Sequence, residues 1–188
     1  MVSVSPAGTT SGASTYTLIA TYTVTGSAAA NYTFTSIPQT FTDLVLVGMV
    51  QGQANGDGPT VYFNGNNTST YFSNTTMYTD GITAKGSTRN SNQAIMDIGT
   101  TSGLPYASTA QFAPTFLHVA NYANTNTYKT GIYEYHTATG GYNAHGDITK
   151  AVYLYSSTAA ITSITVGVNN GKSIPVGSVY SLYGIKAA

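Results

Sequence analysis

Histidine and acidic side chains could carry acid–base or metal chemistry, and this sequence contains few of them. The three histidines are His118, His136 and His145. The six acidic residues are Asp43, Asp57, Asp80, Asp97, Glu134 and Asp147. Catalysis by a carboxylate pair needs two acids that converge on one substrate, and each acid here stands alone between neutral residues. Because motifs for a serine nucleophile, a phosphate loop or a zinc peptidase are missing too, we predict a protein that is not an enzyme and uses no cofactor.

Two short segments have some of the residues that metal sites use. His145 and Asp147 lie two residues apart in a glycine-rich stretch without an adjacent third ligand, whereas zinc sites use three or four protein ligands. Residues 54–58, Ala-Asn-Gly-Asp-Gly, resemble a calcium loop but lack its closing glutamate. A glycine-rich turn is the simpler interpretation of both, so we predict no metal site. His118 falls in a strand pattern, and we expect it to be a buried or half-buried structural residue.

Tyrosine is the unusual aromatic choice of this chain, which has 16 Tyr and no Trp. Tyr133 and Tyr135 alternate along one predicted strand, and Tyr153 and Tyr155 alternate along another. A tyrosine has a large apolar body and a polar tip, which suits both subunit contacts and stacking on sugar rings. The alternative is a sandwich core in which the hydroxyls reach the rim. Both interpretations remain open, and the four tyrosines are our candidate interface residues.

The composition limits the partners that this chain can have. Only 6% of its 188 residues are charged and the formal net charge is zero, against about a quarter charged in ordinary soluble proteins. Such a neutral surface attracts neither nucleic acid nor anionic lipid, and it lacks the charge repulsion that keeps copies apart. We therefore predict no nucleic-acid or membrane partner and expect a homo-oligomer. The absence of cysteine excludes disulfides and thiolate metal sites.

Alternating apolar and polar residues recur along the chain and predict about ten β-strands. The predicted strands cover residues 16–25, 32–35, 43–50, 60–64, 94–98, 115–122, 128–136, 151–155, 161–168 and 178–185. Connections rich in Gly and Asn separate them, and no segment has helical periodicity. The fold class is thus all-β, a two-sheet antiparallel sandwich of jelly-roll-like form. We expect a flexible or docking arm over residues 1–14, a single domain over 15–188, and the longest loops within 66–108.

Five short segments resemble sequences of one group of proteins. Residues 34–47 contain Phe-x-Ser-Ile-Pro followed by Thr-Asp-Leu, and residues 61–67 with Tyr71 contain Phe-Asn-Gly-Asn and a later Tyr, with Asn66 where Asp is usual. The shorter matches lie at 128–130, 160–165 and 177–185. In this order they resemble β-sandwich structural proteins of tailed-phage virions, over nearly the whole chain from about 16 to 186. The resemblance implies a capsid decoration (cement) protein or the tip of a tail fibre, and it implies no catalytic residues.

Two functions follow as expectations. The first is a decoration protein, expected to be trimeric, that binds the outer surface of the major capsid protein and stabilises the head of the virion. The second is a tail-fibre or head-fibre tip whose loops, at 66–108 and 137–147, bind host-surface glycans.

Overall fold

Every regular element in the described part of the chain is a β-strand. The computed structural model describes residues 15–50, 58–68, 71–79, 85–93, 96–97, 112–138, 146–169 and 171–186. The predicted N-terminal arm, residues 1–14, lies outside them. The strands are β1 (Tyr16–Thr23), β2 (Asn31–Phe34), β3 (Asp43–Val50), β4 (Pro59–Phe63), β5 (Phe72–Thr79), β6 (Lys85–Gln93), β7 (Met96–Asp97), β8 (Ala113–Val119), β9 (Lys129–Ala138), β10 (Gly146–Tyr155), β11 (Ile164–Val168) and β12 (Val179–Ile185).

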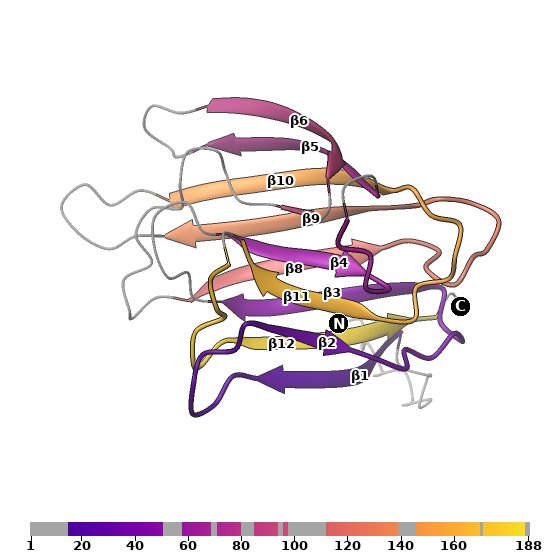
Figure 1. The fold of residues 1–188 in the computed structure, drawn as a ribbon, viewed down its shortest axis with the longest axis horizontal. Helices are drawn as coiled ribbons and strands as arrows, with labels where there is room; N and C mark the ends of the chain where they lie inside the picture. The colour runs from indigo at the N-terminus through magenta and orange to yellow at the C-terminus, as the bar shows by residue number, and fades with distance from the viewer. Residues whose placement is uncertain are drawn as a thin grey trace, which may run out of the picture.

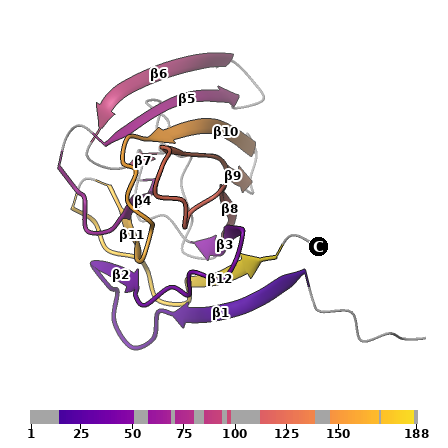
Figure 2. The same cartoon turned by 90° about the vertical axis from the view of Figure 1, so that its right-hand side faces the viewer.

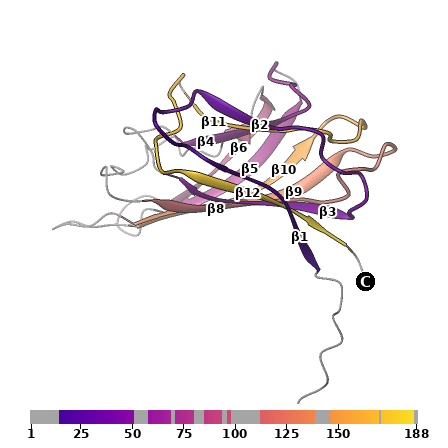
Figure 3. The ribbon, with the colours of Figure 1, turned by 90° about the horizontal axis from the view of Figure 1, so that it is seen from below.

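These strands form two antiparallel sheets (Figure 1). The larger sheet has the order β1-β12-β3-β8-β9-β10-β5-β6, and the smaller sheet has the order β2-β11-β4-β7. Figure 2 shows the larger sheet curving from β6 to β1, with the smaller sheet against its concave side. Seen from below, the two sheets lie as separate layers (Figure 3). The predicted all-β sandwich is therefore confirmed.

The strand order is that of a jelly roll with two added strand pairs. A jelly roll has two four-stranded sheets, in which the first strand pairs with the last and the second with the last but one. In this chain those two sheets are β1-β12-β3-β8 and β2-β11-β4-β7. The pair β5–β6 is inserted between β4 and β7, and the pair β9–β10 is inserted between β8 and β11. Both pairs extend the larger sheet beyond β8, which makes it eight-stranded.

The region predicted to hold the longest loops contains two of the longer strands. β5 and β6 have eight and nine residues and pair with each other over most of their lengths. Their sequences, Phe-Ser-Asn-Thr-Thr-Met-Tyr-Thr and Lys-Gly-Ser-Thr-Arg-Asn-Ser-Asn-Gln, are mostly polar. The prediction of irregular structure over residues 72–79 and 85–93 is therefore wrong, because polar strands that extend a sheet lack the apolar alternation that identifies core strands.

The core lies between the two sheets, where apolar residues from both meet. β3 is apolar on both faces, and it pairs with β12 on one side and with β8 on the other. Its Leu44 and Leu46 face the core, as do Ile164 and Val166 of β11, and all four are buried. Burying each such side chain contributes about 1.5–3 kcal/mol. These contacts hold the two sheets together. They place one side of the larger sheet in the core and leave its other side facing away from the smaller sheet.

Candidate functional site: the outer face of the larger sheet

The four candidate interface tyrosines lie in the core rather than on the surface. Tyr133, Tyr135, Tyr153 and Tyr155 expose only 2%, 1%, 1% and 0% of their area. The prediction that they form an interface is therefore wrong, and the alternative core interpretation accounts for their burial. On β10 the aromatic rings fill the wide space between the sheets, and Val152, on the opposite side of the strand, is left 59% exposed. The alternating sequence pattern places the tyrosines on one face of each strand. It does not indicate which face of the strand points into the core.

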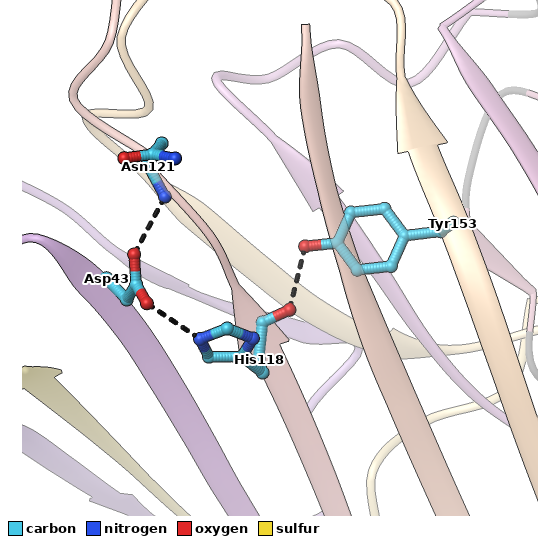
Figure 4. Close-up of polar contacts among 4 residues, drawn as sticks. All are labelled: Asp43, His118, Asn121 and Tyr153. Atoms are coloured by element: carbon cyan, nitrogen blue, oxygen red, sulfur yellow. Dashed lines mark hydrogen bonds and ion pairs between the residues drawn. The ribbon is translucent and has the colours of Figure 1, made fainter.

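Tyr153 of β10 reaches across the neighbouring strand β9 to β8 (Figure 4). Its hydroxyl donates a hydrogen bond of 3.1 Å to the backbone carbonyl of His118. Gly131 of β9 lies directly opposite Tyr153, and a Cβ atom there would lie 1.9 Å from that carbonyl oxygen and 2.6 Å from the tyrosine hydroxyl. Burial raises the pKa of Tyr153 well above its usual value, so the phenol stays protonated and donates. Tyr153 thus ties β10 to β8 across a glycine.

Tyr155 belongs to an aromatic cluster at one end of the same strand. Its ring lies 5.2 Å from that of Phe63 in β4 and 5.1 Å from that of Phe72 in β5, measured between centroids. Asn66, in the turn after β4, donates a hydrogen bond to the Tyr155 hydroxyl. Edge-to-face aromatic pairs add about 0.5–1.5 kcal/mol beyond their burial. The inserted strands β5 and β10 are therefore anchored on the smaller sheet through this cluster.

The opposite side of the larger sheet, which we call the outer face, points away from the smaller sheet. Large apolar side chains between 39% and 65% exposed lie on it. They are Leu18 of β1, Val47 and Met49 of β3, Met77 of β5, Ile132 of β9, and Ile148 and Val152 of β10. Ile132 and Val152 are directly opposite each other in the β9–β10 ladder. An antiparallel sheet that faces water on one side usually alternates to polar residues there, so this face is unusually apolar.

Asp43 and His118 form an ion-pair contact at one end of the outer face (Figure 4). The carboxylate Oδ2 lies 3.0 Å from His118 Nε2, and the backbone N–H of Asn121 donates to Oδ1 at 2.9 Å. An Asp–His pair activates a nucleophile only when a hydroxyl or thiol is within hydrogen-bond reach of the imidazole. The residues opposite His118 on the adjacent strands are Val45 and Ile132, which have neither group. His118 is half-buried, as predicted, and the pair ties β3 to β8.

Glu134 carries a second charged cluster in the middle of the outer face. Its Oε1 lies 2.7 Å from Lys150 Nζ on β10, and its Oε2 lies 3.3 Å from His136 Nε2 on its own strand. The hydrogen bond from Lys150, assisted by that from His136, holds the pKa of Glu134 below its usual value even though burial opposes this. Both carboxylates that the described strands place on this face, Asp43 and Glu134, are thus paired within the face itself.

The two segments that have some of the residues of metal sites fall largely outside the described residues. His145 and residues 54–57 lie outside the described residues, as does the side chain of Asp147. Within the described ranges, no group of three or more His, Cys, Asp or Glu side chains could hold a metal ion. Most connections in the predicted glycan-binding segments, such as 80–84, 98–111 and 139–145, are outside the description as well. Among the described residues there is also no helix long and apolar enough to cross a lipid bilayer.

Sequence reasoning missed the outer face, although a signal for it was present. Val152 and Leu154 alternate with Tyr153 and Tyr155, so one apolar set had to remain outside unless another layer covered it. Comparisons of this chain with protein-family models, with curated proteins and with solved structures found no match.

Proposed function

We propose that the protein is a non-enzymatic structural component of a virus particle, a capsid decoration protein bound to the outer surface of the major capsid protein. The observation that carries this proposal is the outer face of the larger sheet, which combines exposed apolar side chains with carboxylates already paired inside the face. Burying such a face against protein gains hydrophobic free energy and leaves neither of these carboxylates unpaired. Exposed apolar areas of this kind on a folded domain mark interaction surfaces.

The fold and the composition support the same function. Jelly rolls occur in viral capsid proteins and also in lectins, so the topology fits without selecting one function. A charged fraction of 6% and zero formal net charge suit a protein that packs closely against neighbours, because buried lone charges are costly. Such a surface would suit many protein assemblies. We propose a virus particle because five segments, in order, resemble sequences of phage virion proteins.

Imaging of purified virions tests the location. We expect density for this domain on the head, and particles that lack the protein should release DNA at lower temperature or under weaker osmotic shock. Adding the purified protein back to such particles should restore their stability in a saturable manner. Density confined to the tail, or heads that never bind the added protein, would refute the decoration function.

A fibre tip that binds host glycans is the second candidate, and exposed tyrosines favour it. Tyr16 and Tyr128 are 52% and 55% exposed, so their rings are accessible for stacking on a sugar. Both lie away from the middle of the outer face, near one end of β1 and just before β9. A glycan array that compares the wild-type protein with Tyr128→Ala tests this function, which requires specific binding that the substitution weakens.

A further inference from the structure

We propose that two copies of this chain pair along the edge strand β1, with β1 of one copy antiparallel to β1 of the other across a twofold axis. The inference goes beyond the proposed function, because it concerns an edge of the larger sheet and not its outer face. It names a second copy as the partner of that edge.

The described part of the chain has four edge strands, and three of them carry features that oppose pairing with another chain. The edges are β1 and β6 at the two ends of the larger sheet (Figure 2), and β2 and β7 at the ends of the smaller sheet. β2 and β7 have only four and two residues, and β6 contains the basic residues Lys85 and Arg89. Short edge strands and edge charges, especially lysine, are common protection against edge-to-edge association.

β1 has neither form of protection. Its eight residues, Tyr-Thr-Leu-Ile-Ala-Thr-Tyr-Thr, include no charged residue and no proline. Thr, Tyr and Ile are residues that favour strands. β1 pairs with β12 on one side, and no described strand lies along its other side. A long, uncharged edge of this kind can accept another strand through its backbone groups.

The C-terminal half of β1 turns two residues toward the open edge. The backbone N–H of Val24, just after the strand, donates to the Ser178 carbonyl at 2.9 Å, on the side of β12. Successive residues of an antiparallel strand direct their N–H and C=O groups to opposite sides. Thr23 and Thr21 therefore direct these groups away from β12, and both residues are exposed.

A β-bulge in the middle of β1 keeps its N-terminal half in step with this pattern. The backbone N–H of Lys186 donates to the Thr15 carbonyl at 3.4 Å, so Leu18, three residues further on, directs its backbone groups away from β12. The register with β12 shifts between Leu18 and Ala20. Ile19 and Ala20 both pack against the core, where the bulge sets two residues of β1 against one of β12.

Leu18 and Thr21 therefore flank the centre of the open edge, and this arrangement is complementary to itself. When β1 of a second copy lies antiparallel, Leu18 of each copy is opposite Thr21 of the other, and the twofold axis passes between these two pairs. Both members of each pair face the edge, so each pair exchanges two backbone hydrogen bonds. The bulges of the two copies meet at the axis, so the local twist that a bulge adds is the same on both sides of the contact.

Charge permits this contact between identical edges. No like charges lie opposite each other when β1 meets β1, whereas two β6 edges would bring basic residues together. Leu18, which is 55% exposed, would be covered in part by the threonine opposite it. The axis is perpendicular to the sheet, so the outer faces of the two copies lie on one side and stay open for the contact with the capsid proposed above. The pair is a dimer, in place of the trimer expected from the sequence.

Light scattering coupled to size exclusion, with sedimentation velocity, measures the mass of the full chain. We expect twice 19.5 kDa for the wild-type protein. Thr21→Pro removes a backbone N–H that faces the open edge and leaves those that face β12, so it should weaken dimerisation roughly 100-fold through the loss of one hydrogen bond from each copy. Thr21→Val is the matched control, because it keeps the N–H and a β-branched side chain. Its dimerisation should equal that of the wild type.

The double substitution Leu18→Lys with Thr21→Lys tests the same contact without a change in the backbone. Both side chains are exposed, so the variant should fold, and melting curves check this for every variant. In the pair the lysines of the two copies lie directly opposite each other. The mass should therefore be that of one copy at low salt, and added salt should restore part of the dimer.

Hydrogen exchange locates the contact at the edge. The amides of Leu18 and Thr21 should exchange more slowly as the protein concentration rises, because pairing protects them. Exchange that does not depend on concentration overturns the inference, as does a wild-type mass of one or three copies at about 100 µM, where an interface of ordinary affinity is saturated. Equal dimerisation of Thr21→Pro and Thr21→Val, or an unchanged mass of the lysine variant, overturns it too.

The particle assay separates this inference from the proposed function. A monomer that still binds and stabilises heads refutes only the pair. A dimer that never binds heads refutes only the decoration function.

Discussion

Replacing Gly131 with alanine tests the packing on which the outer face rests. The added Cβ would lie 1.9 Å from the carbonyl oxygen of His118 and 2.6 Å from the hydroxyl of Tyr153. The oxygen belongs to the backbone of β8, and the tyrosine is 1% exposed, so neither can move aside freely. The substitution must therefore separate β8 from β9, displace the ring, or both.

The magnitude follows from these two contacts. Overpacking a well-filled interior costs about 1–3 kcal/mol. Loss of the 3.1 Å hydrogen bond from Tyr153 to the His118 carbonyl adds about 1 kcal/mol. We expect Gly131→Ala to lower the free energy of unfolding by about 3 kcal/mol, which for a domain of this size lowers the melting temperature by roughly 6–12 °C.

The assay is urea unfolding followed by circular dichroism, with thermal melting alongside it. Gly167→Ala is the control, since Gly167 also lies in a strand but its nearest neighbour would be the Thr60 hydroxyl oxygen at 3.2 Å. A side-chain oxygen can shift by a few tenths of an ångström, so this change should stay within about 1 kcal/mol of the wild type. Equal stabilities of Gly131→Ala and wild type would show that Tyr153 does not lie over Gly131 as described.

Three further substitutions address charged groups. Lys129 is 1% exposed and its ammonium donates to three backbone carbonyls at 2.8–3.4 Å, so Lys129→Met, which leaves them without this donor, should cost about 2 kcal/mol in urea unfolding. The pKa of Glu134 is lowered in the folded state, so its contribution is complete above its usual value of 4.5 and is lost as the pH falls through the folded-state pKa. The melting temperature of Glu134→Gln should therefore lie below that of the wild type at pH 7, and the gap should close in titrations below pH 4.5. Asp43→Asn weakens the contact with His118 and should cost about 1 kcal/mol in chemical denaturation without changing the oligomeric mass.

The strands that build the core could be predicted because their sequences alternate. β3 was predicted with the bounds that the structure shows, since Asp43 opens it and an apolar run follows. β5 and β6 could not be found in this way, because Thr, Asn and Ser on both faces look the same in a strand and in a loop. Their strand conformation depends on pairing with β10, which is a tertiary interaction that a local pattern does not contain.

The candidate site was less predictable than the fold, for two physical reasons. Alternation assigned Tyr153 to one face and Val152 to the other, but which face points inward depends on the space between the sheets, which suits the larger ring. The partners Asp43 and His118 are 75 residues apart in sequence, and only the pairing of β3 with β8 brings them together. No spacing rule within one segment could have indicated that contact.

The inserted strand pairs connect the core to the surface in one structural argument. Inside, the Tyr153 and Tyr155 rings of β10 fill the space that the added strands create, and the cluster with Phe63 anchors them on the smaller sheet. Outside, the same strand presents Ile148 and Val152, which the fold of one copy leaves largely exposed. Because side chains alternate along a strand, a β10 that is apolar on its inner face could have been polar on its outer face at no cost to the core. That it carries exposed Ile148 and Val152 there, on either side of the paired Lys150, is therefore a property of the surface. Contact with another protein surface is what such a surface favours.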